Sequence, residues 1–182
     1  DFHLHDTVLP EDLKDFETLA RSGRPAIGYE GIKRSGLTAC LCGFGGSMGR
    51  RSSPTPWQLT DIIWDLGIRQ ADMDHHPDVG IRGYSVKDIL EAKKSGRMAI
   101  IPHVENAQMI DNDLDRVDLL YGLGLRCLGL SYNSRTTVAD GCTERSDGGL
   151  SSFGFKVIER MNRLRMLIDL SHSSDMSAKE TI

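Results

Sequence analysis

Residues 98–130 read MAIIPHVENAQMIDNDLDRVDLLYGLGLRCLGL, and this stretch decides the fold. It begins with an apolar run, residues 98–104, that is typical of a buried strand. The apolar residues that come next have helical spacing and end at two glycines: Leu114, Val117, Leu120 and Tyr121, then Gly122 and Gly124. A second apolar run, residues 125–130, is again typical of a strand. Strand, helix and strand in this order predict two parallel strands joined by a helix that covers the sheet.

The same alternation extends in both directions along the chain. We expect further strands at residues 1–5, 37–44 and 166–170. Helices are predicted after Thr55-Pro56, at Ser85-Val-Lys-Asp88 with a stop at Gly96, at residues 153–164, and near Ser174. Their inward faces are predicted to carry Leu59, Ile62, Ile63 and Leu66 in the first helix, and Val157, Ile158, Met161 and Leu164 in the third.

The count of predicted strands is five, whereas a closed (β/α) barrel has eight. The sequence therefore predicts an α/β fold, a partial TIM-type (β/α) barrel with about five of eight parallel strands, in a single incomplete domain over residues 1–182. Residues 8–36 stay unassigned. We expect residues 45–56 to form a loop at the rim of the barrel.

The composition excludes several classes of partner. Lys plus Arg number 22 and Asp plus Glu number 26, so a net charge of −4 argues against nucleic acid or an anionic membrane as a partner. No apolar run approaches the roughly 18–20 residues that a membrane span requires, and we expect no membrane segment in this chain. The chain lacks an initiator Met and stops at Ile182 inside an expected helix, so we expect that both ends are cut.

The four cysteines, Cys40, Cys42, Cys127 and Cys142, have neither the number nor the spacing of a disulfide framework or a ribbon-type zinc site. We expect them to be small core residues. Reduced thiols favour a cytoplasmic location.

Polar residues that can bind a metal stand at the ends of three predicted strands. The first strand reads Asp-Phe-His-Leu-His, so His3 and His5 point to the same side of an extended backbone and could clamp a zinc ion. The alternative is a pair of exposed histidines at a frayed N-terminus. Asp6 faces away or turns into the following loop.

Glu105 follows the apolar strand 98–104, where a carboxylate is costly unless a cation or an ion pair compensates it. His103 lies two residues earlier and shares the inward face. It is either a further ligand or substrate contact or a core histidine with satisfied hydrogen bonds. His172 closes the strand that buries Asp169. Together with His3 and His5, Glu105 and His172 would suffice for a two-metal site with Glu105 bridging.

These residues lie within segments that resemble the membrane (renal) dipeptidase family of zinc metallopeptidases. The resemblance covers nearly the whole chain, is strongest over 98–172 and rests on four segments: residues 124–133, 139–140, 147–154 and 157–172, the last of which ends in Asp-Leu-Ser-His. It implies an amidohydrolase-like barrel that cleaves dipeptides with a free carboxylate at a centre of two Zn²⁺ ions. Whether the protein forms a homodimer stays open.

The resemblance also implies roles for individual residues. The metal ligands of the family fall on His3, Glu105 and His172, whereas the family's Asp in the first pair falls on His5, which is a departure. His5 could still bind metal, or Asp6 could replace it, and either change alters the metal preference. A second departure places Tyr132 where the family often has a His. Tyr132 could donate a hydrogen bond to the developing oxyanion, and His103 is a second candidate donor.

Further site residues of the family would lie beyond Ile182, so we expect this piece alone to be inactive. Two alternatives stay open: an amidohydrolase-type enzyme that acts on another amide or a lactone, and a non-catalytic barrel that acts as a binding protein. Two other polar groups are interpreted as loops: the cluster Asp72-Met-Asp-His-His-Pro-Asp78 as a solvated loop, and Glu144, Arg145 and Asp147 as parts of the long loop 133–150.

Overall fold

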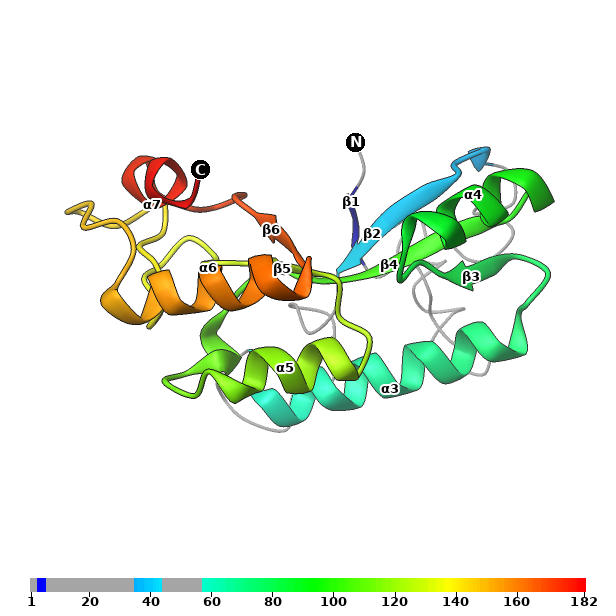
Figure 1. The fold of residues 1–182 in the computed structure, drawn as a ribbon, viewed down its shortest axis with the longest axis horizontal. Coiled ribbons are helices and arrows are strands. Elements are labelled where there is room, and N and C mark those ends of the chain that lie inside the picture. The colour runs from blue at the N-terminus through cyan, green and yellow to red at the C-terminus, as the bar shows by residue number, and fades with distance from the viewer. Residues whose placement is uncertain (1–2, 6–34, 44–56) are drawn as a thin grey trace, which may run out of the picture. The chain divides into compact units, whose positions relative to one another are not determined.

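The computed structural model describes residues 3–5, 35–43 and 57–182 (Figure 1). The elements follow in this order: β1 (His3–His5), β2 (Ala39–Gly43), α3 (Leu59–His75), β3 (Gly80–Arg82), α4 (Val86–Ser95), β4 (Met98–Val104), the 3-10 helix η1 (Gln108–Ile110), α5 (Asp115–Gly122), β5 (Cys127–Gly129), α6 (Ser152–Leu164), β6 (Leu167–Asp169) and α7 (Asp175–Thr181). The predicted rim loop over 45–56 lies outside the described residues.

The chain folds into two compact units. Residues 1–42 and 67–101 form the first, and residues 43–66 and 102–182 form the second. In the first unit β1, β2 and the beginning of β4 are neighbours, and β3 pairs in parallel with β4. The prediction of a single domain stays a prediction.

In the second unit the end of β4 is followed by β5 and then β6, all in parallel register. His103 lies opposite Cys127, and Leu128 lies opposite Ile168. The five predicted strands are all present, and the α/β fold with parallel strands and covering helices is confirmed. The short strand β3 is an addition that the sequence did not reveal, because Gly-Ile-Arg is neither an apolar run nor an alternating one.

The helices of the second unit bury the faces that their apolar spacing predicted. Val117 and Leu120 of α5, and Val157 and Met161 of α6, are fully buried. Helix α6 packs on β6 and on α5, and the figure shows these two helices running side by side (Figure 1). Ser151 caps α6 because its hydroxyl oxygen accepts a hydrogen bond of 2.9 Å from the Gly154 N–H.

Helix α4 begins and ends where the sequence indicated. Ser85 precedes it, and the Asp88 carboxylate accepts hydrogen bonds from the Ser85 hydroxyl (2.8 Å) and the Tyr84 N–H (3.1 Å). Gly96 ends the helix at φ 69°, a left-handed conformation that glycine adopts without a steric penalty.

Two details of the prediction for α3 were wrong. Ile63 is 36% exposed, because each residue turns the helix by about 100° and Ile63 lies one step beyond the face centred on Ile62 and Leu66. The helix also continues to His75, so the first part of the 72–78 cluster is helical and not a loop. The buried stripe runs on through Arg69 to Met73.

Three of the four cysteines are core residues, as predicted. Cys40, Cys42 and Cys127 are buried. Burial raises the pKa of Cys40 to about 12, with a smaller contribution from Cys42, and burial together with the nearby Asp169 raises that of Cys127 to about 12. These two thiols are therefore protonated at neutral pH, as suits small core residues. The prediction was wrong for Cys142, which is exposed because it lies in the loop after β5.

Among the described residues, none of the helices combines the length and the apolar character needed to span a bilayer.

Candidate active site

Three of the predicted site residues follow three neighbouring parallel strands of the second unit. Glu105 comes directly after β4, Tyr132 follows β5, and His172 follows β6. Because the carboxyl ends of parallel strands meet at one edge of a sheet, these residues belong to the same edge. Glu105 is only 6% exposed, whereas Tyr132 is 36% exposed. This edge thus carries both a buried carboxylate and an accessible phenol.

A glycine on β5 fixes the position of the Glu105 backbone. A Cβ atom at Gly129 would lie 2.4 Å from the Glu105 carbonyl oxygen, far inside van der Waals contact. The two strands approach so closely at this point that no side chain fits between them. Gly129 is therefore required for Glu105 to leave β4 where it does.

The imidazole of His172 is held by the residue that follows Tyr132. His172 Nδ1 lies 2.9 Å from the side-chain oxygen of Asn133. An amide oxygen only accepts hydrogen bonds, so this contact favours the tautomer in which Nδ1 carries the proton and Nε2 has the lone pair. This tautomer is the one in which Nε2 can bind a metal ion.

The Tyr132 ring packs on the His172 ring, and the Trp57 ring packs on the Tyr132 ring. The Tyr132 ring lies 4.3 Å from the His172 ring, centroid to centroid, at an angle of 35°. The Trp57 ring lies 5.5 Å from the Tyr132 ring, and Trp57 itself is buried. Tyr132 is thereby flanked by two rings, which limits the directions in which its hydroxyl can point.

His103 pairs with a carboxylate of the neighbouring strand end. Its Nε2 atom lies 3.0 Å from Asp169 Oδ2, and the His103 side chain is fully buried. Burial raises the pKa of Asp169, but the contacts with His103 and the Ser171 N–H outweigh this effect and hold the pKa well below its ordinary value. The pair connects the ends of β4 and β6, which fits a core histidine. A catalytic role for His103 stays a prediction.

The long loop 133–150 is held by buried or well-bonded carboxylates. Arg135 makes a two-pronged ion pair with Asp140, which also accepts a 2.7 Å hydrogen bond from the Gly148 N–H. The bond from Arg135 is the main cause that lowers the pKa of Asp140. Asp147 accepts bonds from the Ser174 hydroxyl and the Met176 N–H, which anchor the loop to the start of α7. These contacts fit the interpretation of Asp147 as a loop residue.

Comparison with models of known protein families identifies the family of this chain. The model of the membrane dipeptidase family, Peptidase family M19, matches residues 68–182, which is more than half of the chain. The chain belongs to the membrane dipeptidase family. The resemblance that the sequence motifs suggested is thereby confirmed.

Individual relatives agree with this assignment. Dipeptidase 3 of Mus musculus is 39% identical over 92 residues, which are 47% of this chain and 19% of that protein. Dipeptidase verJ of Clonostachys rogersoniana is 34% identical over 127 residues, which are 69% of this chain and 31% of that protein. The chain therefore spans about a fifth to a third of the curated relatives that it matches.

The fold agrees as well. A metallo peptidase from Rhodobacter sphaeroides, solved with a phosphinate mimic of the dipeptide L-Ala-D-Ala, superposes with a TM-score of 0.78 at 19% identity. The superposition covers all of this chain and 60% of the other. This chain thus has the fold of part of a TIM-type (β/α) barrel.

Of the predicted ligands, Glu105 and His172 have described side chains, and they follow the strands β4 and β6 on either side of β5. The described parts of the chain contain no group of three or more His, Cys, Asp or Glu side chains that could hold a metal ion. His3 and His5 lie on β1, but their side chains, like Asp6, lie outside what is described. The donors that are described fit a zinc site chemically, because a buried carboxylate and an imidazole nitrogen are both zinc ligands. The full ligand set stays a prediction.

Sequence reasoning missed two residues of this edge. It did not give Asn133 a role beside His172, because the two lie 39 residues apart and belong to different strand ends. It gave Trp57 no role at this edge, whereas its ring packs on the Tyr132 ring. The positive φ angles of Trp57, Asn133 and His172 are signals that only a structure provides.

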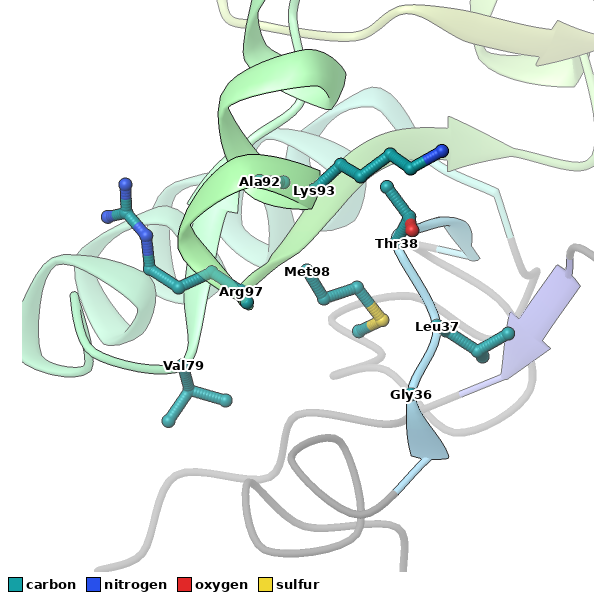
Figure 2. A pocket seen from close by; sticks show the side chains of 9 residues that line it. Gly36, Leu37, Thr38, Val79, Ala92, Lys93, Arg97 and Met98 are labelled. Atoms are coloured by element: carbon teal, nitrogen blue, oxygen red, sulfur yellow. The ribbon is translucent and has the colours of Figure 1, made fainter.

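The first unit contains a hollow. A cavity of about 150 Å³ in the first unit is lined by residues at the amino ends of strands, among them Thr38, Val79 and Met98 (Figure 2). Figure 2 shows the Arg97 side chain directed away from Met98, and its guanidinium donates to Ser95 and to the Pro77 carbonyl. In a β/α barrel the amino ends of strands contribute to stability and the carboxyl ends to catalysis.

Proposed function

We propose that the protein is a metal-dependent dipeptidase that hydrolyses the peptide bond of dipeptides. The observation that carries the proposal is the family match over residues 68–182, a range that contains Glu105, Tyr132 and His172 at three successive strand ends. The two curated relatives are both named dipeptidases, which supports the same substrate class. Because the chain spans only part of these relatives, the proposal concerns the whole protein.

The proposed metal ligands are His3, His5, Glu105 and His172, and the proposed metal is Zn²⁺, with two ions in the complete site. Bound zinc supplies Lewis acidity that polarises the peptide carbonyl and activates a water molecule for attack. Glu105 supplies a buried carboxylate, which is a ligand type that zinc binds. His172 supplies Nε2, whose lone pair the contact with Asn133 leaves available for a metal.

Tyr132 is proposed to donate a hydrogen bond from its hydroxyl to the oxygen that becomes negative during attack. Its partial exposure and its position between the Trp57 and His172 rings support this role. Because a phenol carries no positive charge at neutral pH, its contribution is a directed dipole. His103 is proposed to act indirectly. Its contact with Asp169 would hold the end of β6, which precedes His172.

The test uses the full-length protein and a panel of dipeptides, N-acyl amino acids and lactones. We expect turnover of dipeptides, loss of turnover on chelation and recovery with zinc. Changing Glu105→Gln or His172→Ala should lower kcat/KM by more than about 100-fold, since even residues behind the ligands cost about 10–100-fold. Glu159→Gln, which changes an exposed carboxylate of α6, should leave kcat/KM unchanged. Turnover that survives chelation, or preference for a lactone, would contradict the proposal.

A further inference from the structure

We propose that Asn133 is a positioning residue whose side-chain oxygen fixes the tautomer of His172 and the direction of its Nε2 atom. The proposal starts from the 2.9 Å contact between His172 Nδ1 and Asn133 Oδ1. The tautomer itself is a property of this chain, whereas its consequence for zinc rests on the proposed function.

The backbone of both residues is held in a strained conformation. Asn133 and His172 each have φ 63°, in the left-handed region that L-residues with a bulky side chain rarely adopt. Strain of this kind persists only where the surrounding structure enforces it. Asparagine is among the few residues that tolerate this region, which suits it to the position.

The surrounding hydrogen bonds show what enforces the strain. The His172 carbonyl oxygen accepts a 2.8 Å bond from the Cys142 N–H and a 3.3 Å bond from the Ser131 hydroxyl. The Asn133 carbonyl oxygen accepts bonds from the Thr143 N–H at 3.0 Å and from the Thr143 hydroxyl at 2.9 Å. The same loop therefore fixes the backbones of both residues.

Gly141 allows the backbone of the loop 133–150 to approach the Asn133 backbone closely. A Cβ atom at Gly141 would lie 2.0 Å from the Asn133 carbonyl oxygen. Gly141 also forms a bridge with Ser173, the residue after His172. The loop thus packs against both partners of the Asn133–His172 contact, and the contact follows from the backbone arrangement.

The tautomer is tested directly, without metal. In the metal-free full-length protein at about pH 8.5, where ordinary imidazoles are neutral, nitrogen NMR of the His172 ring should show the proton on Nδ1. The His172→Ala variant assigns the signal. Asn133→Gly keeps the left-handed backbone and removes the acceptor, and should shift the population toward the Nε2-protonated form. Asn133→Asp keeps an acceptor and should retain the Nδ1-protonated form. An unchanged tautomer in Asn133→Gly would overturn the proposal.

Zinc affinity tests the consequence. Asn133→Gly should weaken zinc binding by about 10–100-fold in a chelator competition, the range for residues that orient a ligand. Asn133→Asp should stay within about tenfold of wild type. Cys142→Ala, which removes only the 3.6 Å thiol contact to the same Asn133 oxygen, should leave affinity unchanged. Equal affinity in wild type and Asn133→Gly would overturn the positioning role and leave the proposed function intact. Wild type that binds no zinc would overturn the proposed function, and the NMR result alone would then decide the role of Asn133.

Discussion

At the scale of single residues, the site depends on Gly129, because only a residue without a side chain fits at this position. Since a Cβ atom there would meet the Glu105 carbonyl oxygen at 2.4 Å, Gly129→Ala must push β5 away from the end of β4. We expect the free energy of unfolding to fall by about 1–3 kcal/mol, as for other overpacked cores, and zinc binding to weaken with it. Urea unfolding measures the first effect.

Gly122→Ala is the matched control for this change, because an added Cβ atom at Gly122 meets nothing within 4 Å. It should change the free energy of unfolding by no more than about 0.5 kcal/mol. Equal effects of the two substitutions would show that the close approach of β5 to Glu105 does not constrain the fold.

The types of residue at the candidate site could be predicted from the sequence, but their partners could not. Glu105 and His172 were chosen as candidates because a polar group that follows an apolar strand stands out in the chain. Asn133 carried no such signal, since its partner is 39 residues away and its role depends on a left-handed backbone. From the sequence, His103 suited a catalytic role and a role as a core residue equally well. Its 3.0 Å contact with Asp169, which only the structure shows, favours the role as a core residue.

At the scale of elements, local signals predicted what local physics determines. Helix α4 was located correctly because Ser85, Asp88 and Gly96 act on the backbone within one turn of it. Strand β3 was missed because three residues, Gly80–Arg82, form a strand only through pairing with the beginning of β4. Such pairing is set by distant sequence, which a local pattern does not contain.

The loop 133–150 is the element whose stability should depend on pH. The ion pair with Arg135 lowers the pKa of Asp140, so the pair stabilises the fold fully above the ordinary Asp pKa of about 3.9 and progressively less as the pH falls through the lowered value. Asp140→Asn should therefore lower the free energy of unfolding at pH 7, and the difference from wild type should narrow toward pH 3.

Urea unfolding of wild type, Asp140→Asn, Arg135→Met and the double variant, at pH 7 and about pH 3, measures this coupling. In the Arg135→Met background the effect of Asp140→Asn at pH 7 should be smaller, because the main partner of the carboxylate is gone. A difference that is equal at both pH values would show that the ion pair does not hold the loop.

At the scale of the whole molecule, metal binding and folding should be coupled. A metal ion that binds only the native state raises the free energy of unfolding, by about 2.7 kcal/mol when its concentration is 100 times Kd. Ligands such as Glu105 and His172 come from separate strand ends, so they form one site only in the folded chain, and metal binding and folding are coupled.

Thermal unfolding of the full-length protein, with zinc and with a chelator, measures this coupling. We expect zinc to raise Tm in wild type and to have little effect in Glu105→Gln, whose amide has no charge for the cation to neutralise. Glu159→Gln should keep the full zinc effect. If zinc raised Tm equally in wild type and in Glu105→Gln, Glu105 would not be a metal ligand, and the metal would have to bind elsewhere in the protein.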